Sequence, residues 1–147
     1  MIVRPFSKRD RSSVLDMMTS FYASPAILHK APKETLERCL DDVLNASPYI
    51  EGYVFDEDGE VAGYSLVAKS YSTEFGGMCV WIEDLYVLPE FRGKSFASKF
   101  FEYLEKRYEK DAVRMRLEVE PSNESARRLY RKCGYNELPY VQMTKEF

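Results

Sequence analysis

The chain has 147 residues, of which 45% are hydrophobic and 31% charged, and a formal net charge of -3. That length suits one domain with its own core, so we expect a single domain over residues 1–147. The acidic balance argues against a nucleic-acid partner, and no apolar run has the length of a membrane span. Three widely spaced cysteines and the lack of a recognisable signal peptide favour the reducing cytoplasm.

The first third of the chain is expected to form one strand and two helices. Ile2 to Phe6 reads as a short strand, and Ser7 is placed to cap a helix over 8–22. A loop over 23–31 follows. Pro32 suits the first turn of a second helix, which the apolar spacing extends to Ala46.

Three strands are predicted next. The segments 50–55 and 60–71 flank a turn signal at 56–59, so we expect them to pair as antiparallel neighbours. Two glycines at 76–77 mark another reversal. The apolar run over 78–88 is rich in β-formers and predicts a long central strand.

Helix and strand alternate in the last part of the chain. A loop over 89–94 leads into a helix over 95–110, and strict alternation predicts a strand over 113–119. Another helix is expected from Asn123, and Gly134 ends it. From Tyr135 onward the chain is mostly extended and is expected to supply one or two final strands.

The resulting order, βααβββαβαβ, indicates an α/β fold in which a mixed sheet carries helices on both faces. The strands that begin at Met78 and Val113 are connected through a helix, so they should be parallel neighbours. A ligand crevice is expected beyond the carboxyl ends of these two strands.

Two segments carry chemical signals. In the first, residues 92–97 (Arg-Gly-Lys-Ser-Phe-Ala) join a strand to a helix, where unpaired N–H groups favour an anion and small residues admit a phosphate. On spacing alone, an ordinary connection with a glycine turn is the slightly better interpretation. In the second, Asn123 caps a helix with an inner stripe that packing alone would also explain, formed by Ala126, Leu129, Tyr130 and Cys133.

Together and in this order, the two segments resemble the acetyl-CoA site of the GNAT family of N-acetyltransferases. The phosphate loop of that family reads Arg/Gln-x-x-Gly-x-Gly/Ala, to which residues 92–97 are similar, and residues 123–135 resemble its second motif. The spacing from Ile82-Glu83-Asp84 to Arg92 is similar to that of spermidine/spermine N-acetyltransferases. The resemblance implies the family's fold, a mostly antiparallel sheet in which two parallel strands splay apart.

Ser95 departs from the family pattern, because it stands where the loop usually has its first glycine. A serine lacks the freedom of glycine at positive φ, but a residue in a first helical turn, the position expected for Ser95, needs none. We therefore expect coenzyme binding to be weakened or unchanged, and not lost.

The resemblance implies that acetyl-CoA is the co-substrate, held between the splayed strands without a metal. Its pantetheine would pair with the backbone around 85–87, and its diphosphate would meet the N–H groups from Arg92 to Ser98. The residues assigned in this way to the coenzyme are Leu85, Tyr86, Val87, Arg92, Gly93, Lys94, Ser95, Phe96, Ala97, Ser98, Asn123, Ala126 and Tyr130.

The resemblance also implies a carboxylate that accepts the amine proton and a tyrosine, Tyr130, that protonates the leaving thiolate. Glu83 and Asp84 are the carboxylates in place, and strand alternation would let only one of them face the substrate. By analogy with the polyamine enzymes, the spacing favours Glu83. For Asp84, a structural hydrogen bond or a substrate-binding charge is as good an interpretation as catalysis.

The acceptor is expected to lie beside the first two helices, against Phe21, Tyr22, Ile27, Glu83 and Asp84. A primary amine of a small molecule, such as a polyamine or an amino acid, is the first expectation. A protein N-terminus or lysine side chain is the second. A non-catalytic acyl-CoA-binding sensor or partner module stays open, as does a homodimer.

Overall fold

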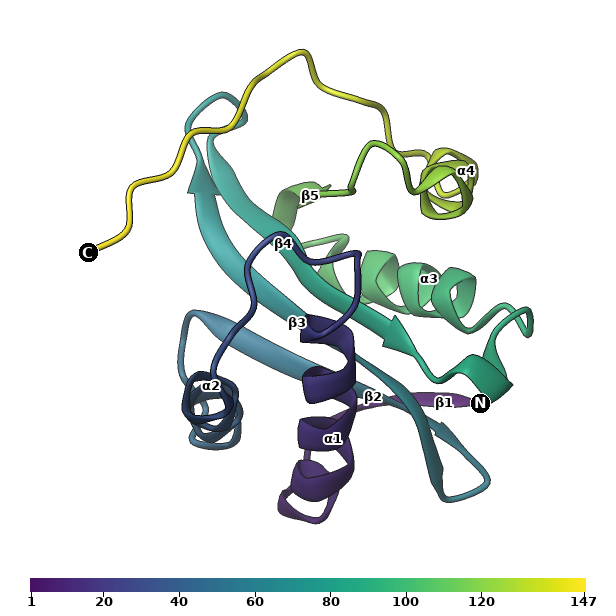
Figure 1. Cartoon of the computed structure of the whole chain (residues 1–147). Coiled ribbons are helices and arrows are strands. Elements are labelled where there is room, and N and C mark those ends of the chain that lie inside the picture. The colour runs from purple at the N-terminus through teal and green to yellow at the C-terminus, as the bar shows by residue number, and fades with distance from the viewer.

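A five-stranded sheet in the order β1-β2-β3-β4-β5 forms the frame of the protein (Figure 1). The computed structural model describes residues 1–147. Its strands are β1 (Ile2–Pro5), β2 (Ile50–Glu57), β3 (Glu60–Ser72), β4 (Gly77–Val87) and β5 (Ala112–Leu117). All neighbours are antiparallel except β4 and β5, which are parallel, so this part of the prediction is confirmed.

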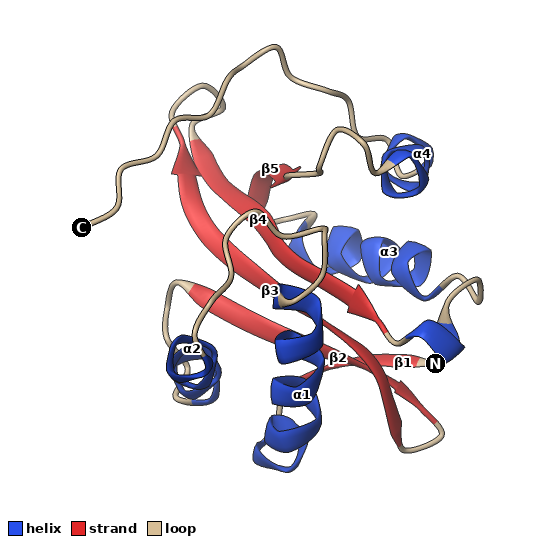
Figure 2. Cartoon of the chain, in the orientation of Figure 1, coloured by secondary structure: helices blue, strands red, loops and turns tan.

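Helices cover both faces of the sheet (Figure 2). They are α1 (Arg11–Tyr22), α2 (Lys33–Leu44), α3 (Phe96–Tyr108) and α4 (Glu124–Lys132), with short 3-10 helices η1 (Lys8–Asp10) and η2 (Pro89–Phe91). Apolar residues of α1 and α2 pack on one face, and those of α3 and α4 pack on the other. None of these helices has both the length and the apolar character that a membrane span requires.

Local chemistry explains where α1 begins and where α2 begins and ends. The amide and hydroxyl of Ser7 both donate to Asp10, at 2.8 and 2.6 Å, which fixes the turn that leads into α1. Pro32 precedes α2 as its N-cap instead of starting it. Ala46 adopts a left-handed φ of 57°, so α2 ends before it and is shorter than predicted.

One extra residue in β4 changes which way its side chains point. Leu66 of β3 pairs with Asp84 and Val67 pairs with Ile82, so Glu83 has no partner and forms a β-bulge. Ile82 therefore packs on the α3 side, whereas Asp84 lies on the α1 side beside Tyr64.

A gap opens along β4 beyond this bulge. β5 pairs with β4 only from Met78 to Ile82, and β5 ends at Leu117, earlier than predicted. The stretch from Glu83 to Val87 therefore has one free edge, as the expected splaying of the parallel strands requires.

The predicted final strand is not formed. Residues 133–147 belong to no helix or strand, and the chain arches from α4 over the β3–β4 hairpin (Figure 1). The beginning of this tail is bonded to α4, because Glu137 accepts hydrogen bonds from Arg127 and Arg131 at 2.7 and 2.5 Å. Pro139 has no amide hydrogen to donate to a ladder, which weakens pairing to the edge of β5.

Candidate functional site

A run of unbonded backbone amides precedes and opens α3. The six N–H groups from Gly93 to Ser98 donate to no backbone or side-chain acceptor. Gly93 and Ser95 both have positive φ, 77° and 62°, and this double reversal brings the chain from η2 into α3. Free amides at a helix N-terminus form a place for an anion.

Two details of this loop differ from the prediction. Ser95 is the left-handed N-cap of α3 and not part of its first turn, so the expectation that it needs no positive φ was wrong. The loop must reverse direction there, which overrides the residue's own preference. The amide of Arg92 donates to the carbonyl of Pro89 at 3.2 Å, so the free run begins at Gly93.

The neighbouring side chains divide between the two faces of the sheet. Leu85 and Val87 pack on the α3 side, and Phe96, which is 3% exposed, is a core residue that can offer a ligand only its amide. The ring of Tyr86 packs on the α1 side against Phe21, with 5.7 Å between ring centroids. The Arg92 guanidinium donates to the carbonyl of Val87 at 3.0 Å, so that acceptor is already used.

The two neighbouring carboxylates of β4 have different surroundings. Glu83 is exposed and has no hydrogen bond or ion pair, whereas Asp84 is 2% exposed. Asp84 accepts hydrogen bonds from Tyr22 at 3.1 Å and from Tyr64 at 3.0 Å. Strand alternation alone does not explain this difference, because the bulge leaves both acids near Tyr22, whose pKa is raised by burial first, then by Asp84 and least by Glu83.

The pKa values of Asp84 and Glu83 are both raised above their ordinary values. Burial raises the pKa of Asp84 to about 6, although the two tyrosine hydroxyls act in the opposite direction and Glu83 adds to the rise. Partial desolvation, followed by repulsion from Glu118, raises the pKa of Glu83. Asp84 thus serves as a structural hydrogen-bond acceptor, and Glu83 is the one that a substrate can reach.

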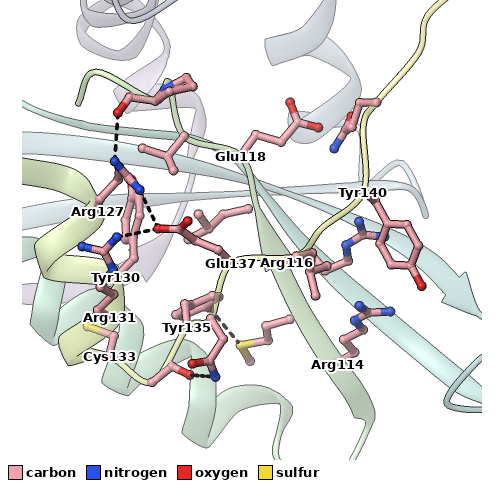
Figure 3. A pocket seen from close by; sticks show the side chains of 18 of the residues that line it. Arg114, Arg116, Glu118, Arg127, Tyr130, Arg131, Cys133, Tyr135, Glu137 and Tyr140 are labelled. Carbon is pink, nitrogen blue, oxygen red and sulfur yellow. Dashed lines mark hydrogen bonds and ion pairs between the residues drawn. The ribbon is translucent and has the colours of Figure 1, made fainter. Parts of the chain in front are cut away.

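A cavity of about 860 Å³ lies beside β5, α4 and the C-terminal tail (Figure 3). Tyr130 lines it from α4, with its ring edge-on to Phe101 at 5.7 Å. Burial, with a smaller contribution from Cys133, raises the pKa of Tyr130, so its hydroxyl keeps its proton at neutral pH. The free amides and Glu83 do not line this cavity.

Glu118 is a site residue that the sequence reasoning missed. It follows β5 directly, lines the cavity and is the charge that acts on Glu83 across the gap between β4 and β5. Its place in an alternating strand predicted only an outward-facing residue. Glu118 and Glu83 are far apart in the sequence, and the parallel pairing of β4 and β5 brings them near each other.

The remaining predicted residues lie at the end of α1, in the loop that follows it and at the start of α4. Phe21 and Tyr22 lie at the end of α1 beside Tyr86 and Asp84, whereas Ile27 is half-buried in the loop after it. Asn123 caps α4 as predicted, since its side chain accepts from the amide of Ala126 at 3.1 Å. That bond occupies the side-chain oxygen of Asn123.

Known proteins resemble this chain in sequence and in fold. A thialysine N-epsilon-acetyltransferase of Bos taurus is 38% identical over 79 residues, which is 53% of this chain and 46% of that protein. The chain thus matches about half the length of this relative. A candidate ribosomal-protein-alanine N-acetyltransferase of Bacillus subtilis is 30% identical over 138 residues, covering 90% of this chain and 78% of that protein.

The fold has a close counterpart among solved structures. The crystal structure of a possible acetyltransferase from Clostridium difficile superposes with a TM-score of 0.86 at 21% identity, covering 99% of this chain and 97% of that one. The model of the acetyltransferase (GNAT) family matches residues 15–135, which include β4, the loop of free amides and α4. The chain belongs to the GNAT family of acetyltransferases.

Proposed function

We propose that the protein transfers the acetyl group of acetyl-CoA to a primary amine of a small molecule, by direct attack in a ternary complex. One juxtaposition carries this proposal. The exposed Glu83 begins the free edge of β4, and the six unbonded amides from Gly93 to Ser98 follow the end of the same strand. Membership of an acetyltransferase family supports the reaction class.

The amides would hold the diphosphate of the coenzyme. Each contact between a helix N-terminus and an anion contributes roughly 0.3–1 kcal/mol, so several in one loop can bind two phosphates. The free edge from Glu83 to Val87 offers backbone groups to the pantetheine amides, except for the Val87 carbonyl that Arg92 occupies. Acetyl-CoA would supply the activated acetyl group.

Glu83 would accept the proton that the amine releases, and Tyr130 would donate a proton to the leaving sulfur. Glu83 accepts a proton from the amine, directly or through water, because an ammonium with a pKa near ~10 must lose one before it can attack. The amine nitrogen then forms a bond to the thioester carbon, and the carbon–sulfur bond breaks. The sulfur leaves with the electron pair of that bond and receives a proton from Tyr130, whose raised pKa keeps that proton available.

The acidic side chains around the gap suit a cationic acceptor. Glu83 and Glu118 have no cationic partner in the protein, and the cavity beside Glu118 has the volume for a small molecule. A protein N-terminus is the second candidate, favoured by the match over 90% of this chain to the Bacillus subtilis relative with that name.

Thiol release from acetyl-CoA with a panel of small amines, and with peptides that begin with alanine, tests the proposal. We expect turnover with at least one small amine and weaker turnover with the peptides. The Glu83→Gln variant should lose activity by about 10²-fold or more, and Glu102→Gln, an exposed change on α3, should not.

Calorimetry with acetyl-CoA completes this test. Tight coenzyme binding without thiol release from any amine or peptide would identify a non-catalytic sensor and contradict the proposal. Turnover confined to the peptides would replace the small-molecule acceptor by a protein.

A further inference from the structure

Two opposite charges on one side of the cavity have no partner in the protein. Arg116 and Glu118 both line the cavity, and their side chains point to the same side of β5 (Figure 3). The other three arginines of the cavity are all paired with carboxylates, namely Arg114, Arg127 and Arg131. Arg116 and Glu118 therefore stand out as a separated pair that another molecule could bridge.

The contacts of Arg116 leave its hydrogen-bonding edge free. Its guanidinium lies over the ring of Trp81 at 4.2 Å, a cation–π contact, and it donates no hydrogen bond to any protein acceptor. Arg114 has the same arrangement over Phe75 at 4.9 Å, and in addition its guanidinium pairs with Glu74 at 2.8 Å. The neighbouring arginine thus has the carboxylate that Arg116 lacks.

Arg116 is on the wrong face of the sheet for the coenzyme diphosphate. Trp81, on which it lies, alternates along β4 with Val80 and Ile82, and these two pack in the cluster beneath α3. The amides from Gly93 to Ser98 open α3 on that opposite side. An anion bound by Arg116 is therefore not the diphosphate that those amides would hold, which leaves the acceptor as its source in our proposal.

Glu118 defines the other end of the same surface. Alternate residues of an extended chain lie roughly 6.5–7 Å apart, so a cation beside Glu118 and an anion beside Arg116 would be separated by only a few bonds. Glu118 also repels the charge of Glu83, so a positive charge at that end would relieve the repulsion between these two carboxylates.

We infer that the acceptor is a zwitterion of the amino-acid class, whose reacting amine lies between Glu83 and Glu118 and whose carboxylate binds Arg116. This inference rests on the proposed function, since it deepens the nature of the acceptor. It distinguishes amines that carry a carboxylate a few carbons away from polyamines, which would place a second cation against Arg116.

Matched pairs of amines that differ only in the carboxylate test the inference. Suitable pairs are γ-aminobutyrate with propylamine, δ-aminovalerate with butylamine and ε-aminocaproate with pentylamine. In calorimetry with the coenzyme-bound protein, and in thiol release, we expect at least one amino acid to exceed its alkylamine by about tenfold or more, since an added charge-assisted hydrogen bond has that effect.

Substitution of Arg116 tests whether this residue causes the preference for the amino acid over its matched alkylamine. Arg116→Met should abolish it by weakening binding of the amino acid while leaving the alkylamine unchanged, and Arg116→Lys should restore part of it. Arg107→Met is the matched control, because Arg107 also lies over an aromatic ring, that of Tyr108 at 5.2 Å, but outside the cavity. Melting temperatures verify that each variant is folded.

Equal binding of every pair by the unsubstituted protein would overturn the inference, as would loss of coenzyme affinity in Arg116→Met. If the calorimetric preference depends on Arg116 but no amine releases thiol, the zwitterion site stands and the proposed catalytic function fails.

Discussion

Glu83 of β4 and Glu118, the residue that follows β5, act on each other across the gap where the two strands part. Partial desolvation, followed by repulsion from Glu118, raises the pKa of Glu83, and neither carboxylate has a cationic partner. A carboxylate whose pKa is raised is a stronger base, so this shift is in the direction that the proton transfer proposed for Glu83 requires.

Removal of Glu118 should therefore change the pH profile of the proposed reaction. In Glu118→Gln the repulsion is absent and the pKa of Glu83 falls, so the acidic limb of kcat/KM should move to lower pH. A profile of thiol release, followed toward acidic pH until kcat/KM falls, measures this shift. Glu120→Gln, an exposed neighbouring change, should leave the limb in place, and a limb that does not move in Glu118→Gln would contradict the coupling.

Asp84 should make the protein less stable as the pH rises. Its folded pKa of about 6 lies above its ordinary value of 3.8, so the native state binds more protons than the unfolded state between these values. The resulting loss of unfolding free energy is about 3 kcal/mol across that window. In denaturant unfolding, the free energy of unfolding of Asp84→Asn should rise by this amount relative to that of the unsubstituted protein between pH ~4 and ~7. A constant difference would show that Asp84 titrates normally.

Ser95 should be a site where glycine stabilises the protein. A left-handed φ of 62° strains a serine but not a glycine, so Ser95→Gly should raise the free energy of unfolding by about 0.5–1 kcal/mol. The same change at Ser98, inside α3, should lower it by about 1 kcal/mol. Destabilisation by both changes, measured without coenzyme, would show that the loop gains nothing from glycine.

Tyr130→Phe should separate chemistry from binding. The hydroxyl of Tyr130 has no hydrogen-bond partner, so its loss should lower kcat by about 10²-fold while acetyl-CoA affinity changes little. Tyr135→Phe is the control from the same aromatic cluster, since its hydroxyl contacts only the sulfur of Met115 at 3.7 Å. Equal losses of kcat and affinity in Tyr130→Phe would indicate a packing role.

The order of the elements as far as α4 was predictable because it follows from local patterns, whereas the strand expected after α4 does not form. Hydrophobic periodicity located the helices and strands to within a few residues, and the helix between β4 and β5 implied their parallel pairing. The cap of α4 at Asn123 likewise depends on residues within one turn.

Features that depend on distant parts of the chain were not predictable in the same way. The bulge at Glu83 appears only when β4 is counted against β3, and the left-handed Ser95 follows from the direction in which the chain must enter α3. The unpaired tail from Tyr135 and the coupling of Glu83 to Glu118 also depend on how separate segments meet.

The bulge has a consequence for how β4 tolerates changes in length. Because Glu83 is the surplus residue, it rephases the strand so that Tyr86 reaches α1 while Leu85 and Val87 reach α3. Deleting this one residue would leave Asp84 directly after Ile82, and regular alternation would then keep Tyr86 on the α1 side. One further residue inserted at the bulge would instead turn Tyr86 into the opposite layer, so the fold should tolerate the loss of Glu83 better than an insertion beside it.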